Sequence, residues 1–151
     1  MRNIIGIAAA VVAFTCAAAA AAGMAKDEYK AGKVRIDAEY QADRQKCGSR
    51  HGNSADLCIA RAHGARKVAK AELEATYKPS PRANYEAAIA RAQAAYAIAK
   101  EDCDDQKAEA RKGCVSDAKA AQERAKTEAT AALKASSLER ALPAKPVDAP
   151  R

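Results

Sequence analysis

Two cysteine-bounded segments decide the fold: residues 47–58, which read CGSRHGNSADLC, and residues 103–114, which read CDDQKAEARKGC. The cysteines of each pair have the same spacing, and the second segment follows the first at an offset of 56 residues. Around them, residues 29–77 align with residues 85–133 without a gap, with tyrosine, arginine, lysine and glutamate positions matched. One unit has therefore been duplicated.

Helical periodicity describes each unit. Before the loop, larger residues fall on one side of a helix: Tyr29, Ile36, Tyr40 and Cys47, then Tyr85, Ile89, Ala92, Tyr96 and Cys103. After the loop, small residues do so: Cys58, Ala62, Ala65, Ala69 and Leu73, then Cys114, Ala118, Ala121, Ala125 and Ala129. Small side chains let helix backbones approach closely. We predict an all-α protein of two tandem antiparallel helical hairpins, which can pack as an elongated four-helix bundle.

Four segments follow from this pattern: a signal peptide over 1–25, a first hairpin over 26–80, a second over 81–140, and a disordered Pro-rich tail over 141–151. Between the hairpins, Ser80 is suited to cap a new helix and Pro81 to be its first residue. In the first loop, Asn53 resembles an N-cap, with Asp56 in the first turn. In the second loop, Gly113 is the expected break.

The first 25 residues predict export. Arg2 supplies a positive n-region, and an uncharged stretch follows it before small residues suited to cleavage after Ala22 or Ala25. A removed signal peptide is favoured over a retained anchor because the second half of the stretch is almost pure alanine. Residues 13–15 make a poor lipobox, so Cys16 is expected to be an apolar residue of the signal rather than a lipidation site.

Cleavage lowers the net charge from +7 to +6 and leaves four cysteines in an oxidising periplasm. The preferred disulfides are Cys47 to Cys58 and Cys103 to Cys114, each closing its own hairpin. The alternative pairs Cys47 with Cys114 and Cys58 with Cys103 across two continuous helices; the glycines of the first loop argue against it. Aromatic residues make up only 4% of the chain, so a thick core is not expected and the disulfides matter for cohesion.

The GNSADLC run at 52–58, the AKAELE phrase at 69–74 and the EDCDD run at 101–105 resemble a group of small exported, Ala/Lys-rich helical proteobacterial proteins. Members are described as hypothetical or loosely as TolA-like cell-envelope proteins. The resemblance covers about residues 25–135, and its most specific part is the Gly-Asn-x-x-Asp-x-Cys element. The second loop departs from that element, because 108–114 reads AEARKGC. The group supplies no catalytic residues.

Two residue clusters contain side chains of the types that bind metal ions. Cys47, His51, Cys58 and His63 together offer sulfur and nitrogen ligands for zinc or copper, but the second unit has no histidine and oxidation competes for the thiols. An acidic cluster, Glu101, Asp102, Asp104 and Asp105, lacks the pattern of a calcium loop and is interpreted as a charged helix end. No cofactor is expected.

The chain carries no enzyme signature: no phosphate-binding glycine loop, no HExxH and no nucleophile elbow. Acids and bases interleave at i,i+4, as in Arg35/Glu39 and Lys70/Glu74, which is typical of a solvated helix face. We predict a non-enzymatic periplasmic structural or interaction protein whose partner is a protein or another envelope component. Nucleic acid is not expected as a partner, and the basic excess is compatible with weak contact to a membrane surface. The alternatives are a stress-related holdase and a Cys/His metal-binding protein.

Overall fold

The computed structural model describes residues 24–141, and within that range all regular structure is helical. The helices are α1 (Lys26–Cys47), α2 (Asn53–Tyr77), α3 (Pro81–Cys103) and α4 (Ala108–Ala141). The prediction of an all-α protein built from antiparallel hairpins is confirmed, because α1 packs on α2 and α3 packs on α4. The predicted signal peptide up to residue 23, with Cys16, and the predicted tail from residue 142 lie outside the described residues.

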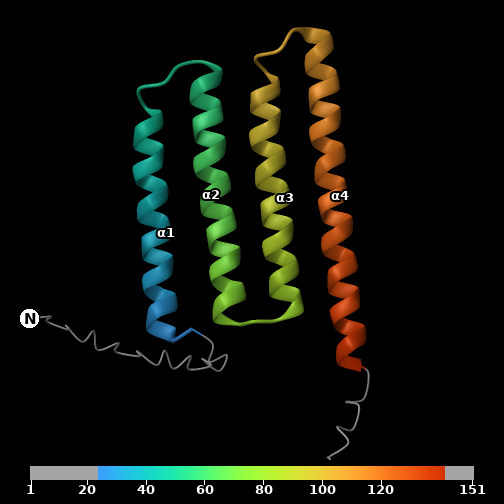
Figure 1. Cartoon of the computed structure of the whole chain (residues 1–151). Coiled ribbons are helices and arrows are strands. Elements are labelled where there is room, and N and C mark those ends of the chain that lie inside the picture. Colours follow the sequence, from blue (N-terminus) through green and yellow to red (C-terminus); the bar gives the residue numbers. More distant parts are fainter. Residues whose placement is uncertain (1–23, 142–151) are drawn as a thin grey trace, which may run out of the picture.

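The four helices lie side by side in one row, in chain order (Figure 1). Each helix contacts its neighbours in the chain, and across residues 24–141 no contact joins α1 to α4. Both cysteine loops lie at the same end of the helices, at the top of Figure 1, and the α2–α3 turn lies at the opposite end. The bundle is therefore an open, single layer with two broad faces exposed to solvent, not a ring of helices around a central core.

The turn between the hairpins follows the sequence closely. Helix α2 ends at Tyr77, the Ser80 hydroxyl accepts a hydrogen bond of 3.0 Å from the backbone N–H of Ala83, and Pro81 is the first residue of α3. A serine cap supplies an acceptor to an otherwise unpaired N–H, and proline loses no hydrogen bond at the first helical position. The predicted stop and restart are confirmed.

The predicted caps of the cysteine loops were wrong in two places. Gly52, with φ of 57°, occupies the N-cap position of α2, because this left-handed backbone conformation suits glycine. Asn53 is instead the first helical residue, and its Nδ2 donates a hydrogen bond of 2.9 Å to the Glu101 carbonyl oxygen of α3. In the second loop the break falls at residues 104–107, so Gly113 lies inside α4. Aspartate is a weak helix former, which accounts for the end of α3 at Asp104.

Small residues set the spacing between helices. A Cβ added at Gly32 of α1 would lie 2.8 Å from Leu73 Cδ1 of α2, and one added at Gly64 would lie 3.1 Å from Ala94 Cβ of α3. The buried apolar residues are mostly alanines: Ile36, Cys47, Ala62, Leu73, Ala87, Ala90, Ala92, Ala94, Cys103 and Ala129. Close packing of many small side chains thus replaces a thick core.

Two members of the predicted small-residue stripes, Ala65 and Ala121, are exposed, so their assignment to the packing face was wrong. Helix α2 packs on two sides: Leu73 lies against α1, whereas Gly64 lies against α3. Ala65 falls between these contact lines. Ala121 lies at one edge of the α3–α4 contact, where it lines an open groove with Tyr96 and Ala118.

Candidate functional site

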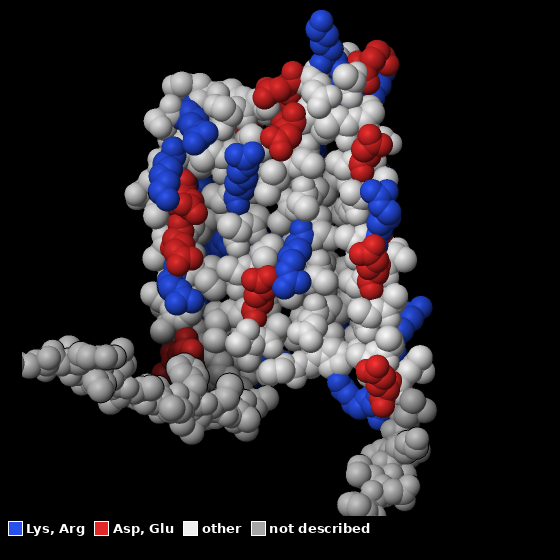
Figure 2. Space-filling view, viewed as in Figure 1, with Lys and Arg blue, Asp and Glu red and all other residues white. Residues whose placement is uncertain are grey.

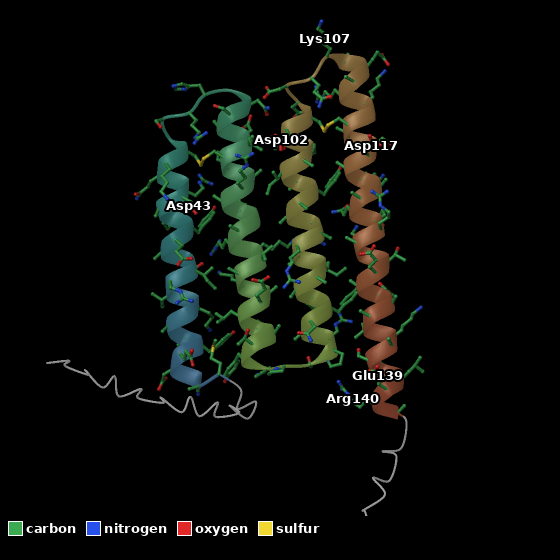
Figure 3. The ribbon with its side chains drawn as sticks, viewed as in Figure 1. Asp43, Asp102, Lys107, Asp117, Glu139 and Arg140 are labelled. Atoms are coloured by element: carbon green, nitrogen blue, oxygen red, sulfur yellow. A yellow bond between two sulfur atoms is a disulfide. The ribbon has the colours of Figure 1, made fainter. Side chains whose placement is uncertain are left out.

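Both disulfides lie at the loop end of the layer (Figure 3). Cys47 is bonded to Cys58 and Cys103 to Cys114, with Cα–Cα distances of 5.6 and 5.7 Å. This matches the preferred pairing, in which each bridge closes its own hairpin. A bridge that closes a loop of this size stabilises the fold by about 3 kcal/mol in the chain-entropy model.

The four candidate zinc or copper ligands of the first hairpin are not brought together. The sulfurs of Cys47 and Cys58 are bonded to each other, and His51 is exposed in the first loop. His63 lies on α2 against Tyr40 of α1, with ring centroids 5.0 Å apart. Among residues 24–141, no group of three or more His, Cys, Asp and Glu side chains is arranged to hold a metal ion.

His63 belongs instead to a polar cluster between α1 and α2, which we call the Tyr40 cluster: Asp37, Tyr40, Arg44, His63, Arg66 and Lys70. The Tyr40 hydroxyl lies 3.0 Å from His63 Nε2, and Arg44 Nη1 lies 3.4 Å from the same nitrogen. The Arg66 guanidinium lies over the Tyr40 ring, 4.7 Å from its centroid. A cation over an aromatic face is attracted by the ring quadrupole, so the ring holds Arg66 in place.

Asp37 anchors the cluster. Its Oδ1 lies 2.8 Å from Arg66 Nε and 2.9 Å from Lys70 Nζ. The hydrogen bonds from Lys70 and from Arg66 lower the pKa of the Asp37 carboxyl below its ordinary value. One carboxylate thus lies between two cations, and the cluster as a whole is positively charged. Its groups are suited to bind an anion.

Sequence reasoning missed this cluster. It paired Lys70 with Glu74 along α2, whereas Lys70 reaches across to Asp37, and Glu74 accepts a hydrogen bond from Tyr29. That hydrogen bond raises the pKa of Tyr29. The predicted pair of Arg35 and Glu39 is present, at 3.8 Å. A cross-helix pair needs the registry of two helices, and only the spacing within one helix is visible in a sequence.

Three of the four carboxylates in the acidic cluster at the end of α3 pair with nearby cations, and the fourth, Asp105, is exposed in the loop. Asp102, labelled near the loop end of α3 in Figure 3, lies 3.8 Å from Arg61 of α2. Asp104 Oδ1 lies 2.9 Å from Arg111 Nε of α4, and Glu101 pairs with Lys100. These pairs agree with the interpretation as a charged helix end, and they also link α3 to α2 and α4.

A groove of about 510 Å³ opens between α3 and the C-terminal half of α4, with Tyr85, Ala88, Ala129 and Leu133 in its lining. The equivalent place in the first hairpin is filled. There Tyr29 stacks on Tyr77, with centroids 4.1 Å apart, and Leu73 covers Gly32. The replacement of the larger residues by alanine and leucine in the second unit accounts for the groove.

No known family model, curated protein or solved structure matches the chain. Of the helices within residues 24–141, none has an apolar stretch long enough to traverse a bilayer.

Proposed function

We propose that this protein is a non-enzymatic interaction protein of the bacterial cell envelope, exported across the inner membrane and oxidised there. One observation carries the proposal: four helices form an open layer, and two disulfides close it at one end. Such a layer exposes both broad faces and gains part of its cohesion from bridges that form outside the cytosol. The resemblance to small exported Ala/Lys-rich proteins supports the same cellular location.

The charged groups also favour binding over catalysis. The carboxylates of Asp37, Glu72 and Asp102 each lie beside a cation from a neighbouring helix, and the cations beside Asp37 lower its pKa. A general acid or base needs a pKa near the working pH, usually obtained by burial in an apolar pocket. Paired, solvent-exposed carboxylates instead orient helices and present charge to a partner.

Fractionation of cells that produce the full chain tests both the periplasmic location and the formation of the two disulfides. The expected result is a chain shortened at its N-terminus in the periplasmic fraction, with Cys47, Cys58, Cys103 and Cys114 all protected from alkylation until a reductant is added. Tryptic mapping without reduction is then expected to yield linked peptides within each hairpin. A full-length chain in the cytosol with four free thiols would overturn the proposal.

The groove beside Tyr85 favours a second candidate function, a holdase that binds apolar segments of unfolded proteins. Tyr85, Ala129 and Leu133 supply apolar surface at a place where the first hairpin has none open. This candidate predicts that the protein suppresses aggregation of a thermally unfolded model substrate and that Leu133→Lys abolishes suppression. If the wild-type protein has no effect on aggregation, the holdase function is excluded.

A further inference from the structure

We propose that one broad face of the helical layer binds the surface of an anionic lipid bilayer. The inference rests on the proposed role as an interaction protein and identifies its partner. We call this surface the basic face. It is the side of the layer that carries the Tyr40 cluster on α1 and α2, Gln93 and Lys100 on α3, and Lys119 on α4.

On α1 and α2 the basic face begins with the Tyr40 cluster. Arg44 is exposed there, and Arg66 and Lys70 lie on either side of Asp37, whose charge they more than compensate. Lys67, the neighbour of Arg66, donates a hydrogen bond to Gln93 of α3. The basic surface therefore continues across the α2–α3 contact.

On α3 and α4 the same side of the layer remains basic. Lys100 follows Gln93 by two helical turns and so lies on the same side of α3. Lys100, which also pairs with Glu101, lines an open groove with Asp104 and with Arg111, Lys112 and Lys119 of α4. Several carboxylates on this side are engaged: Glu74 with Tyr29, Glu86 with Arg82, and Asp104 with Arg111.

The opposite face carries mixed charges. Its bases are largely paired with acids: Arg35 with Glu39, Arg61 with Asp102, and Arg91 with Glu72. In Figure 1, α1 runs from bottom to top with α2 on its right. Because α-helices are right-handed, this orientation turns the opposite face toward the viewer, and Figure 2 shows acidic and basic side chains interspersed on it. Within residues 24–141, the excess of basic over acidic side chains therefore lies mainly on the basic face.

The shape of the basic face matches a bilayer. Four parallel or antiparallel helices of this length, packed 8–10 Å apart, make a surface roughly 35 Å on each side. A broad array of lipid phosphates can meet basic side chains of all four helices at once, whereas a nucleic-acid duplex, being a convex rod, presents its phosphates to fewer of them. Lys and Arg near an anionic surface are attracted over about a Debye length, roughly 10 Å at 0.1 M salt.

Vesicle co-sedimentation of the oxidised protein tests the proposal. The probes are vesicles of equal parts phosphatidylglycerol and phosphatidylcholine, and vesicles of phosphatidylcholine alone. The test variant is Lys67→Gln/Lys100→Gln/Lys119→Gln on the basic face. The matched control is Arg35→Gln/Lys46→Gln/Arg91→Gln on the opposite face, which removes the same net charge. Circular dichroism checks that both variants keep their helices.

The expected result is binding to the anionic vesicles that weakens as salt is added, and no binding to the neutral ones. The basic-face variant is expected to bind at least about tenfold more weakly, and the control less than about threefold, because each basic residue close to the lipid adds several-fold to affinity. Equal losses in the two variants, or equal binding to both vesicles, would overturn the proposal.

Inorganic polyphosphate distinguishes a bilayer from a soluble polyanion. If polyphosphate binds as tightly as the anionic vesicles and with the same dependence on Lys67, Lys100 and Lys119, the partner is a soluble polyanion and the proposal is wrong. A protein that is exported and oxidised but binds no vesicles also refutes it, while the proposed function stands. A reduced cytosolic protein that binds vesicles would instead refute the proposed function alone.

Discussion

The sizes of individual side chains set the distance between the two helices of each hairpin. In the first unit Gly32 lies beneath Leu73, and at the equivalent positions of the second unit stand Ala88 and Ala129. The first unit therefore places a small residue opposite a large one, whereas the second unit places two alanines opposite each other. The two units thus show different solutions to the same contact, and the pair of positions is expected to be energetically coupled.

We expect Gly32→Ala to have opposite effects in two backgrounds. In the wild-type chain the new methyl is forced against Leu73 Cδ1, and we expect a loss of about 1 kcal/mol in the free energy of unfolding. In a Leu73→Ala background the methyl partly fills the void, and alanine also favours helix over glycine, so a gain of about 1 kcal/mol is expected. Urea unfolding of the four proteins gives the coupling. Equal effects in both backgrounds would contradict it.

Asp37 makes the stability of the fold depend on pH in the acidic range. Since its pKa is lower in the folded chain than in the unfolded one, its ion pairs stabilise the fold at pH values above the unfolded pKa, and this stabilisation disappears as the pH falls through the folded pKa. Lys70 and Arg66 are the cause, so the effect belongs to the Tyr40 cluster.

We therefore expect Asp37→Asn to flatten the acid limb of the stability profile. Between about pH 5 and pH 2 the melting temperature of the variant should fall less than that of the wild-type protein. Asp117→Asn, which removes an exposed carboxylate of α4, serves as control and should retain the wild-type slope. Parallel profiles for wild type and Asp37→Asn would show that the cluster does not stabilise the fold.

At the scale of the helix, α1 and α4 differ from α2 and α3. Each outer helix packs on one neighbour, whereas each inner helix packs on two. The disulfides link outer to inner helices, Cys47 of α1 to Cys58 of α2 and Cys103 of α3 to Cys114 of α4. Each bridge therefore holds the helix that has the fewest other contacts.

The double variant Cys47→Ser/Cys58→Ser is expected to lower the free energy of unfolding by about 3 kcal/mol and to release α1 selectively. Hydrogen exchange followed by mass spectrometry should show faster exchange in residues 26–47, with little change in α3. The matched variant Cys103→Ser/Cys114→Ser should shift the effect to α4. Unchanged protection of α1 in the first variant would show that packing on α2 alone holds it.

At the scale of the whole molecule, the open layer predicts a gradient of protection. Backbone amides of α2 and α3 should exchange most slowly in the wild-type protein, and those of α1 and α4 faster, because local opening is easier where fewer contacts are broken. Equal protection in all four helices would instead indicate a closed bundle in which α1 packs on α4. The same measurement therefore distinguishes the two arrangements of one set of helices.

The residue pattern alone predicts the helices, the duplication and the disulfide pairing, because each depends on local order: alanine-rich periodicity, a repeat at a fixed offset, and cysteines that flank a glycine-containing loop. It also predicts the Ser80 and Pro81 start of α3. It does not predict that Asn53 bonds to α3, nor that Lys70 pairs with Asp37 rather than Glu74.

The open row of helices and the division of charge between its two faces depend on tertiary contacts that the sequence does not reveal. Small residues occur on several sides of these helices, so the sequence allows a closed ring and a flat layer alike. Which faces meet depends on how the backbones fit at Gly32 and Gly64. Side chains far apart in the chain, such as Arg44, Lys67 and Lys119, share one surface because contacts along the row fix the rotation of every helix.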